Sequence, residues 1–396
     1  MFAALNQFIA RKSLSAPGAP TIGTATATGI STATVAFTQP ASNGGAAITS
    51  YTATSSPGGI TGVLVQAGSG TITVSGLASS TSYTFTVTAT NAIGTSAPSA
   101  ASNSITTSAA VTQKAIFGFG FTGARVSTTN LVSNTGVVAT DTTGIGTGRE
   151  GLAASSYGGD KAIFGYGFVG GYQSMTNLVA NTGVVATDTT GVGTARAYLA
   201  AAGYGTDKAI FGYGSTGSAV SLSNLVSNTG VVSTDTAGVG TARNALAATS
   251  YGSSGQAIFG YGTTGVNVSL TNLVSNAGVI ATDTTGVGTI RSWLAAATYG
   301  TGLAVFGYGF AGGYLSMTNR VSSAGVVATD TTGVGTTRGF LAAAGYGGDK
   351  AIFGYGDNGG NVSMTNLVSN TGVVATDTTG VGTARSYLAA AGFSFS

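Results

Sequence analysis

The stretch KAIFGYG at residues 161–167 decides the fold, because the chain repeats it six times with small changes. Its central phenylalanine recurs at intervals of 47, 47, 48, 47 and 47 residues, at Phe117, Phe164, Phe211, Phe259, Phe306 and Phe353. An aspartate keeps the same spacing, at Asp141, Asp188, Asp235, Asp283, Asp330 and Asp377. So does an arginine, at Arg149, Arg196, Arg243, Arg291, Arg338 and Arg385. A fixed period of roughly 20 to 50 residues indicates a propeller, a solenoid or another repeat array.

Each repeat contains four strand-like runs and no helical periodicity. In the second copy these runs are 161–167, 174–179, 183–188 and 198–204. Asn181-Thr182-Gly183 separates two apolar runs and predicts a tight hairpin with Gly183 in the left-handed region. The last run, Leu-Ala-Ala-Ala, consists of helix-forming residues, but a narrow central channel favours small side chains on the innermost strands. We therefore expect blades of four antiparallel strands.

The two ends of the repeat region predict a closed ring. The copies start near residues 114, 161, 208, 256, 303 and 350, and no Leu-Ala-Ala-Ala run precedes the first. A spare one stands at 387–393, where it can complete the first blade. An open array would instead need polar capping repeats. Residues 111–396 are therefore predicted to form a six-bladed β-propeller closed by the C-terminal strand.

Composition excludes several classes of function. Charged residues make up 6% of the chain, against about 25% in ordinary globular proteins. The net charge of +3 is spread out, which argues against nucleic acid as a partner. The chain has no Cys and no His, so a thiolate site and the commonest general base are missing. No apolar run is long enough for membrane insertion, and Arg11 and Lys12 follow the apolar N-terminus where a secretion signal would have them first.

Residues 1–15 are predicted to be a helical tail. Apolar side chains recur there at helical spacing, at Phe2, Leu5, Phe8 and Ile9. A helix this short is marginal in water, so we expect a docking peptide that becomes ordered on a partner. A frayed terminus is the alternative.

Residues 16–110 are predicted to form a β-sandwich. Short Thr- and Val-rich runs at 34–38, 48–54, 70–74 and 83–89 are separated by Gly, Pro, Ser and Asn clusters. Pro20, Pro40, the Ile-Thr-Ser-Tyr run at 48–51 and the segment from Leu77 to Phe85 resemble a fibronectin type III domain. The resemblance implies a tyrosine corner formed by Leu77 and Tyr83, with Phe37 in place of the core tryptophan, and a spacer role.

The repeats resemble two kinds of known sequence. Phe-Gly-Tyr-Gly stands where kelch repeats have a double glycine, and a recurring arginine precedes the first strand of the blade, although the tryptophan of that family is missing. The KAIFGYG and TGVVATDTTG arrays also resemble repeats in structural proteins of marine tailed phages. The first resemblance implies a kelch-like propeller. The second implies a multicopy virion protein, as a tail fiber or capsid decoration, held by other virion proteins through its N-terminus.

The aspartate and arginine that lie eight residues apart in each copy form the one repeated charged motif. We expect the aspartate to cap a turn and the arginine to bridge blades, each pair contributing at most about 1 kcal/mol if exposed. Thr-Asp-Thr-Thr-Gly lacks the acid density of a Ca²⁺ loop, so neither a metal nor a cofactor is expected. Ring symmetry spreads these six carboxylates around a circle, and the chain is therefore predicted not to be an enzyme.

Differences among the copies predict a binding face. The loop after the second run and the position two residues after the arginine vary most, and both emerge on one face of a four-stranded blade. Their aromatic residues suit contact with a glycan or a protein. The candidates are Phe168, Tyr172, Trp293, Phe310, Tyr314 and Phe340. Drift in loops combined with aromatic packing between blades is the alternative.

Together these features predict a virion structural protein, on an extracellular particle, whose propeller serves host attachment or contact with a virion partner. A bacterial surface adhesin or glycan-binding protein is the alternative.

Overall fold

The computed structural model describes residues 13–29, 31–108 and 113–393, and all of the regular structure in these ranges is β-strand. The chain divides into two compact units, Met1–Ala110 and Val111–Ser396. The predicted docking residues Phe2, Leu5, Phe8 and Ile9 lie outside the described residues.

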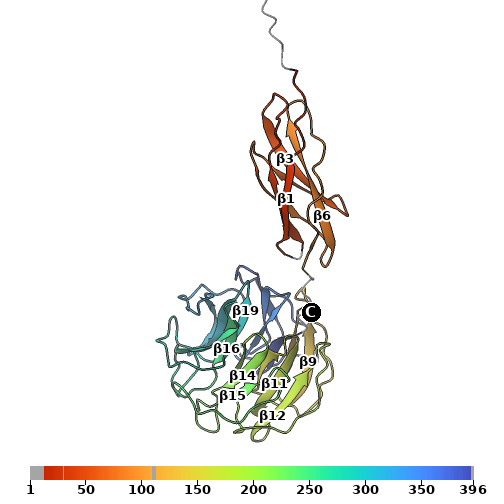
Figure 1. Cartoon of the computed structure of the whole chain (residues 1–396). Helices are drawn as coiled ribbons and strands as arrows, with labels where there is room; N and C mark the ends of the chain where they lie inside the picture. Colours follow the sequence, from red (N-terminus) through yellow and green to blue (C-terminus); the bar gives the residue numbers. More distant parts are fainter. Residues whose placement is uncertain (1–12, 30, 109–112, 394–396) are drawn as a thin grey trace, which may run out of the picture. The chain divides into compact units, whose positions relative to one another are not determined.

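The N-terminal unit is a sandwich of a three-stranded and a four-stranded sheet, seen in red and orange in Figure 1. The first sheet pairs β1 (Thr21–Ala27), β2 (Thr32–Thr38) and β5 (Gly70–Ser75). The second has the order β4 (Thr61–Leu64), β3 (Ile48–Ser56), β6 (Ser82–Asn91) and β7 (Ile105–Thr106). Alternate residues of β6 are buried, because successive side chains of a strand point to opposite faces.

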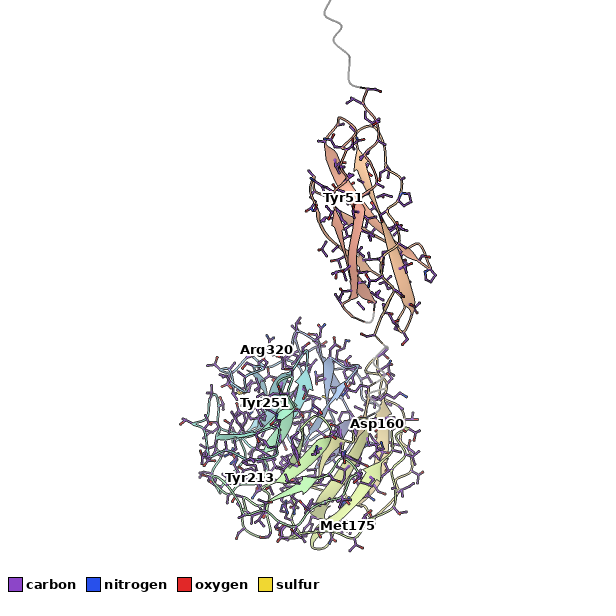
Figure 2. The ribbon with its side chains drawn as sticks, in the orientation of Figure 1. Tyr51, Asp160, Met175, Tyr213, Tyr251 and Arg320 are labelled. Carbon is purple, nitrogen blue, oxygen red and sulfur yellow. The ribbon has the colours of Figure 1, made fainter. Side chains whose placement is uncertain are left out.

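Two contacts fix this core. Tyr83 Oη accepts a hydrogen bond from the backbone N–H of Ala78 at 2.9 Å, which is the geometry expected of a tyrosine corner. Phe37 is buried and packs on Tyr51, with ring centroids 4.3 Å apart; Tyr51 is labelled in Figure 2.

Residues 113–393 form six sheets of three antiparallel strands each, a six-bladed propeller. The innermost strands contact one another in a closed cycle, and Figure 1 shows several of the blades beside one another. In order from inside to outside, the sheets are β25 (Ala389–Phe393), β8 (Lys114–Phe121), β9 (Arg125–Val132); β10 (Ala153–Tyr157), β11 (Lys161–Phe168), β12 (Tyr172–Val179); β13 (Ala200–Tyr204), β14 (Lys208–Gly212), β15 (Ser223–Val226); β16 (Ala247–Tyr251), β17 (Gln256–Gly260), β18 (Thr271–Val274); β19 (Ala295–Tyr299), β20 (Leu303–Phe310), β21 (Tyr314–Val321); β22 (Ala342–Tyr346), β23 (Lys350–Gly354) and β24 (Thr365–Val368).

The prediction of four strands per blade is wrong by one. The outermost run of the second copy touches β12 only through two isolated bridges, of which one joins Val179 to Val185. The predicted turn between these runs is present, with Gly183 at a φ of 86°. The ladder does not continue, because the side-chain amide of Asn177 donates a hydrogen bond of 3.0 Å to the carbonyl of Ala186, which is then not paired with a backbone N–H of β12.

The C-terminal strand closes the ring as predicted. β25 pairs antiparallel with β8, with Ala389 opposite Gly118 and Phe393 opposite Lys114. The Ala-rich run therefore forms the innermost strand, where its small side chains line the channel.

Neighbouring blades interlock through the Phe-Gly pair of the repeat. The glycine after each phenylalanine leaves room for the phenylalanine of the next copy. A Cβ on Gly165 would lie 2.6 Å from Cζ of Phe211, and one on Gly354 would lie 2.7 Å from Cζ of Phe117. The second contact joins the last copy to the first, so the closure uses the same packing as the other interfaces.

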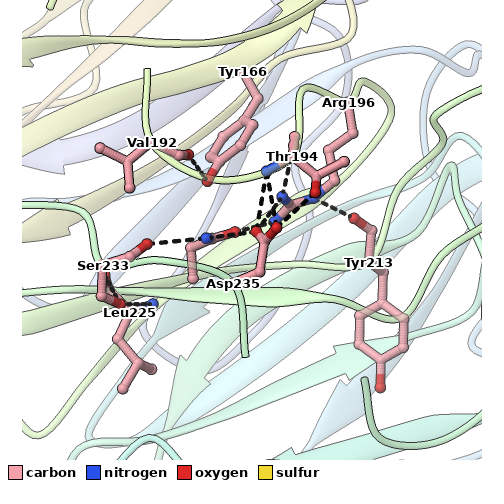
Figure 3. Close-up of polar contacts among 9 residues, drawn as sticks. Tyr166, Val192, Thr194, Arg196, Tyr213, Leu225, Ser233 and Asp235 are labelled. Atoms are coloured by element: carbon pink, nitrogen blue, oxygen red, sulfur yellow. Dashed lines mark hydrogen bonds and ion pairs between the residues drawn. The ribbon is translucent and has the colours of Figure 1, made fainter. Parts of the chain in front are cut away.

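A buried arginine bridges each pair of blades (Figure 3). Arg196 is fully buried; its Nε donates to the carbonyl of Tyr213 at 2.9 Å and its Nη2 donates to Asn224 Oδ1 at 2.6 Å. The guanidinium also lies over the ring of Tyr166 in the preceding blade, 4.3 Å from its centroid. All six arginines repeat this arrangement, although Arg149 lies over Phe119 and not over a tyrosine.

The acidic partner of each arginine comes from the next copy. Arg196 Nη1 lies 3.7 Å from Asp235 Oδ1, whereas Asp188, eight residues before Arg196, lies 3.7 Å from Arg149. The expected pairing within one copy is therefore wrong. The reason is that the loop between Asp188 and Arg196 crosses from one blade to the next. The expected bridging role of the arginine is present, but in a buried network and not in an exposed ion pair.

Hydrogen bonds keep these aspartates ionised. Burial alone would raise the pKa of Asp235, but hydrogen bonds from Thr194 and Asn224, helped by the charge of Arg196, hold it below its ordinary value of 3.8. Thr194 donates through both its backbone N–H and its hydroxyl. The same shift occurs at Asp141, Asp188, Asp283, Asp330 and Asp377.

The closing contact can be tested with Gly354→Ala, which places a methyl group against the ring of Phe117. We expect a loss of about 1–3 kcal/mol in the free energy of unfolding, as for other overpacked cores. Gly360→Ala is the matched control, because no atom lies within 4 Å of its Cβ position. Equal stabilities of the two variants in denaturant titrations would show that the first and last blades do not meet as described.

The aspartate network predicts how stability depends on pH. Because these pKa values are lowered on folding, the contribution of each aspartate is present above the unfolded value of 3.8 and is lost as the pH falls through the lower folded value. The denaturation midpoint of the propeller should therefore fall as the pH drops below about 4. Residues 13–108 contain no acidic group, so this loss belongs to the propeller. A midpoint that rises on acidification would refute the network, and Asp235→Asn should reduce the pH dependence.

Candidate functional site: an aromatic face at the mouth of the channel

The variable position two residues after each arginine forms a ring of backbone hydrogen bonds. Each N–H in the ring donates to the carbonyl of the preceding copy, from Tyr198 to Gly151 at 2.7 Å through to Gly151 to Tyr387 at 2.9 Å. All six residues have left-handed backbones, with φ between 53° and 61°. They are Gly151, Tyr198, Ala245, Trp293, Phe340 and Tyr387.

The hydrogen bonds of this ring do not depend on which side chain each residue carries. The hydrogen bonds need only a peptide unit in the left-handed region, which glycine adopts freely and other residues adopt at a cost of about 1–2 kcal/mol. Gly151 shows that the ring accepts glycine. The chain nevertheless places four large aromatic residues there, so the backbone strain that glycine would avoid is retained. Such strain concentrates at functional sites.

The four aromatic side chains of the ring pack on one another across the mouth of the central channel. The ring centroids of Trp293 and Phe340 are 4.7 Å apart, those of Phe340 and Tyr387 are 4.6 Å apart, and those of Tyr198 and Trp293 are 5.2 Å apart. Tyr198 lies over Gly151, where a Cβ would come within 2.5 Å of its ring. All four side chains are half-buried. Together with the first residues of the inner strands, they line a cavity of about 120 Å³.

Two aromatic hairpins extend this cluster. Phe310 and Tyr314 face each other at the β20–β21 turn with ring centroids 5.5 Å apart, and Tyr314 lies 6.5 Å from Phe340. Phe168 and Tyr172 form the equivalent pair at the β11–β12 turn, 5.4 Å apart. We call these eight residues the aromatic face: Phe168, Tyr172, Tyr198, Trp293, Phe310, Tyr314, Phe340 and Tyr387.

The structure places all six sequence-predicted residues on this face, half-buried. Trp293, Phe310, Tyr314 and Phe340 belong to one continuous cluster, and the Phe168–Tyr172 pair lies beside Tyr198, whose pKa is raised by burial and then by nearby groups that include Tyr172. Trp293 and Phe340 therefore pack across the channel mouth, whereas the aromatic residues that pack between blades are a different set, such as Phe211 on Tyr166. Tyr198 and Tyr387 occupy the same variable position two residues after the arginine but were not among the candidates, although their aromatic character was the signal that could have included them.

Three charged residues on this face were missed by the sequence reasoning. Glu150 and Asp357 are the two acids, of eleven in the chain, that belong neither to the six repeated aspartates nor to the recurring Asp-Lys pairs at Asp160, Asp207 and Asp349. Arg125 likewise stands where other copies have Tyr, Asn or Ala. A charged residue that breaks the repeat was the available signal.

Each of the two acids accepts hydrogen bonds on one of its two carboxylate oxygens. Arg125 donates to Glu150 Oε1 through Nε at 3.1 Å and through Nη2 at 2.8 Å, and its guanidinium lies over Phe168, 4.9 Å from the centroid. Asp357 Oδ1 accepts a hydrogen bond from the Tyr314 hydroxyl and another from the N–H of Gly359 at 3.0 Å. The bond to Asp357 raises the pKa of Tyr314, so the Tyr314 hydroxyl stays protonated.

Both acids contribute to the raised pKa of the same tyrosine, Tyr387. Burial raises the pKa of Tyr387 to about 12, and Tyr198, Glu150 and Asp357 add to the shift. Two carboxylates that are far apart in the sequence thus lie on the same face, where both raise the pKa of one tyrosine.

The opposite end of the channel is polar. A cavity of about 340 Å³ there is lined by hydroxyl groups that include those of Ser156, Ser250 and Thr298. Gln113 is bound at this end, since its carbonyl accepts from Gly347 N and its Oε1 accepts from Gly348 N, both at 2.9 Å. Gln113, the first described residue of the propeller, therefore lies at the end away from the aromatic face.

The described residues contain no group of three or more acidic side chains placed to hold a metal ion. The Thr-Asp-Thr-Thr-Gly aspartates accept hydrogen bonds from Thr and Asn side chains, as Asp188 does from Thr147 and Asn177. Within the same ranges, no helix could cross a membrane.

Comparison with known proteins adds two kinds of finding. The fibronectin type III domain model matches residues 18–105. A multidomain fragment of titin is 30% identical over 24% of this chain and 33% of its own length, with a TM-score of 0.21. The chain thus spans about a third of that fragment. No curated protein matches the sequence.

Two further solved structures resemble most of the chain. One is a fungal alcohol oxidase of the AA5 family in complex with copper, 14% identical, covering 70% of this chain and 66% of its own, with a TM-score of 0.45. The other is YjhT, 9% identical, covering 65% of this chain and 96% of its own, with a TM-score of 0.46.

The oxidase overturns the prediction that the chain is not an enzyme, since a solved structure that resembles the chain is an enzyme. The sequence argument considered only the six repeated aspartates, whereas Glu150 and Asp357 are further carboxylates on the aromatic face, bound to Arg125 and Tyr314. At this level of likeness no activity passes to the chain. What the match to residues 18–105 and the two-sheet sandwich establish together is that the N-terminal unit is a fibronectin type III domain.

Proposed function

We propose that the propeller is a recognition module that binds its target through the aromatic face. The observation that carries this proposal is the retention of four aromatic side chains at left-handed positions where Gly151 and Ala245 show that small residues suffice. Tyr and Trp combine a large apolar surface with a polar group, and they are enriched where proteins bind their ligands.

The copies supply a second argument. Six repeats of one template would give six equivalent surfaces, yet the aromatic residues of the variable positions and three charged residues that break the repeat gather at one end of the channel. Arg320, which stands where the other copies have leucine, lies elsewhere and binds Gly372. Arg125, Glu150 and Asp357 all lie there, beside the aromatic residues. The interfaces between blades keep the arginine, the asparagine and the Phe-Gly pair in every copy. Aromatic and charged residues that break the repeat and share one face indicate a surface that has diverged for contact.

We further propose that the chain is a structural protein of a tailed-phage particle that displays this face to the host surface, with kelch-like repeats as its scaffold. The resemblance of the repeat arrays to marine phage structural proteins supports this part, as does a surface with few charges. Mass spectrometry of purified particles, in which peptides of residues 113–393 are expected, tests it.

The recognition role is tested by Trp293→Ala in the full-length chain. Binding of the fluorescently labelled protein to a panel of marine bacterial isolates, measured by flow cytometry, should weaken about thirtyfold, as for a central hot-spot residue. The fold should persist, because Ala245 occupies the equivalent position with the same backbone conformation.

Val184→Ala is the matched control, because Val184 is an exposed apolar residue on the outer run of a blade. It should bind as the unchanged protein does. Wild-type affinity in Trp293→Ala, or no binding of the unchanged protein to any isolate, would exclude the aromatic face as a recognition surface.

A further inference from the structure

We infer that the aromatic face binds a neutral carbohydrate, with Glu150 and Asp357 accepting hydrogen bonds from its hydroxyl groups. This inference rests on the proposed recognition function and names the ligand class of the same site.

The combination of side chains fits a sugar. One face of a pyranose ring carries C–H groups that pack on aromatic rings, while its hydroxyls need fixed hydrogen-bond partners. The aromatic face offers Trp293, Phe340 and Tyr387 as a stacked apolar surface. Carboxylates lie beside that surface. A purely apolar protein partner would bury them without hydrogen-bond partners, which costs free energy.

Both carboxylates are oriented in advance and still have an acceptor to offer. The hydrogen bonds from Arg125 end on Oε1 of Glu150, and those from Tyr314 and Gly359 end on Oδ1 of Asp357. The second oxygen of each has no hydrogen-bond partner within the described ranges, and neither is among the fully buried atoms that lack one. Two acceptors are thus fixed in direction and open to a ligand. Preorganised acceptors of this kind bind hydroxyl groups without the entropy loss of ordering a free side chain.

The charges select against acidic sugars. Arg125 is neutralised by its ion pair with Glu150, whose side chain is only 12% exposed. Asp357 is held by a hydroxyl and a backbone N–H, neither of which carries charge. These three residues leave one net negative charge at the site. A uronic acid or a sulfated sugar would meet like charge there, whereas a neutral sugar would not.

The test uses the full-length chain and immobilised polysaccharides. Neutral probes are mannan, dextran and galactan, and acidic probes are alginate and heparin. We expect binding to at least one neutral probe and none above background to either acidic probe. Glu150→Gln and Asp357→Asn should each weaken neutral binding by about tenfold or more, because a hydrogen bond to a charged acceptor is replaced by one to a neutral acceptor. Asp207→Asn, which changes the acid of an exposed ion pair at a hairpin tip, should leave binding unchanged.

Preferred binding to an acidic probe would overturn the inference, as would neutral binding that neither carboxylate variant weakens. Should the protein bind cells through Trp293 while no neutral polysaccharide binds or competes, the carbohydrate assignment fails and the recognition function stands. Should Trp293→Ala bind cells normally, the recognition function itself fails.

Discussion

The buried guanidinium that crosses every blade interface is the interaction on which the propeller depends. Each arginine is fully enclosed, donates to a backbone carbonyl and an asparagine of the next blade, and covers an aromatic ring of the preceding one. A buried cation without such partners would be strongly destabilising, so each network is stable only when both blades are in place. The sixth network joins Arg385 to Asn130 and Asp141, and thereby ties the last copy to the first.

Because this network and the Phe-Gly packing lie between the blades, the residues at the mouth of the channel can vary without loss of these contacts. The ring of backbone hydrogen bonds fixes where each side chain starts and does not depend on which residue is present. Glycine, alanine and four aromatic residues therefore occupy equivalent positions in one ring. A rigid scaffold with a variable surface at one end is the arrangement that recognition requires, since binding groups are best held by elements that do not move.

Periodicity predicted most of the fold. The 47-residue spacing and the spare Ala-rich run indicated six blades and their closure. The pairing of β25 with β8 follows because the first copy lacks a preceding Ala-rich strand and the C-terminal run supplies it. The spacing could not show that Asp235 serves Arg196, since a motif repeated in every copy looks the same whether partners lie within a copy or between copies. The fourth strand was lost to a side-chain hydrogen bond from Asn177 that no pattern of apolar residues reveals. At the site, comparison of the copies found the aromatic positions, but the placement of Glu150 and Asp357 on one face depends on ring closure in three dimensions.

A double-mutant cycle between Arg385 and Asp141 tests the closed ring most directly. These residues lie at opposite ends of the repeat region and 3.8 Å apart in the structure. With Arg385→Met and Asp141→Asn, we predict a coupling free energy of about 0.5–3 kcal/mol, the range for residues in one network. Arg149→Met and Asp141→Asn, whose sites are eight residues apart within one copy, should be additive to within about 0.5 kcal/mol. Coupling in the second cycle and none in the first would contradict the account.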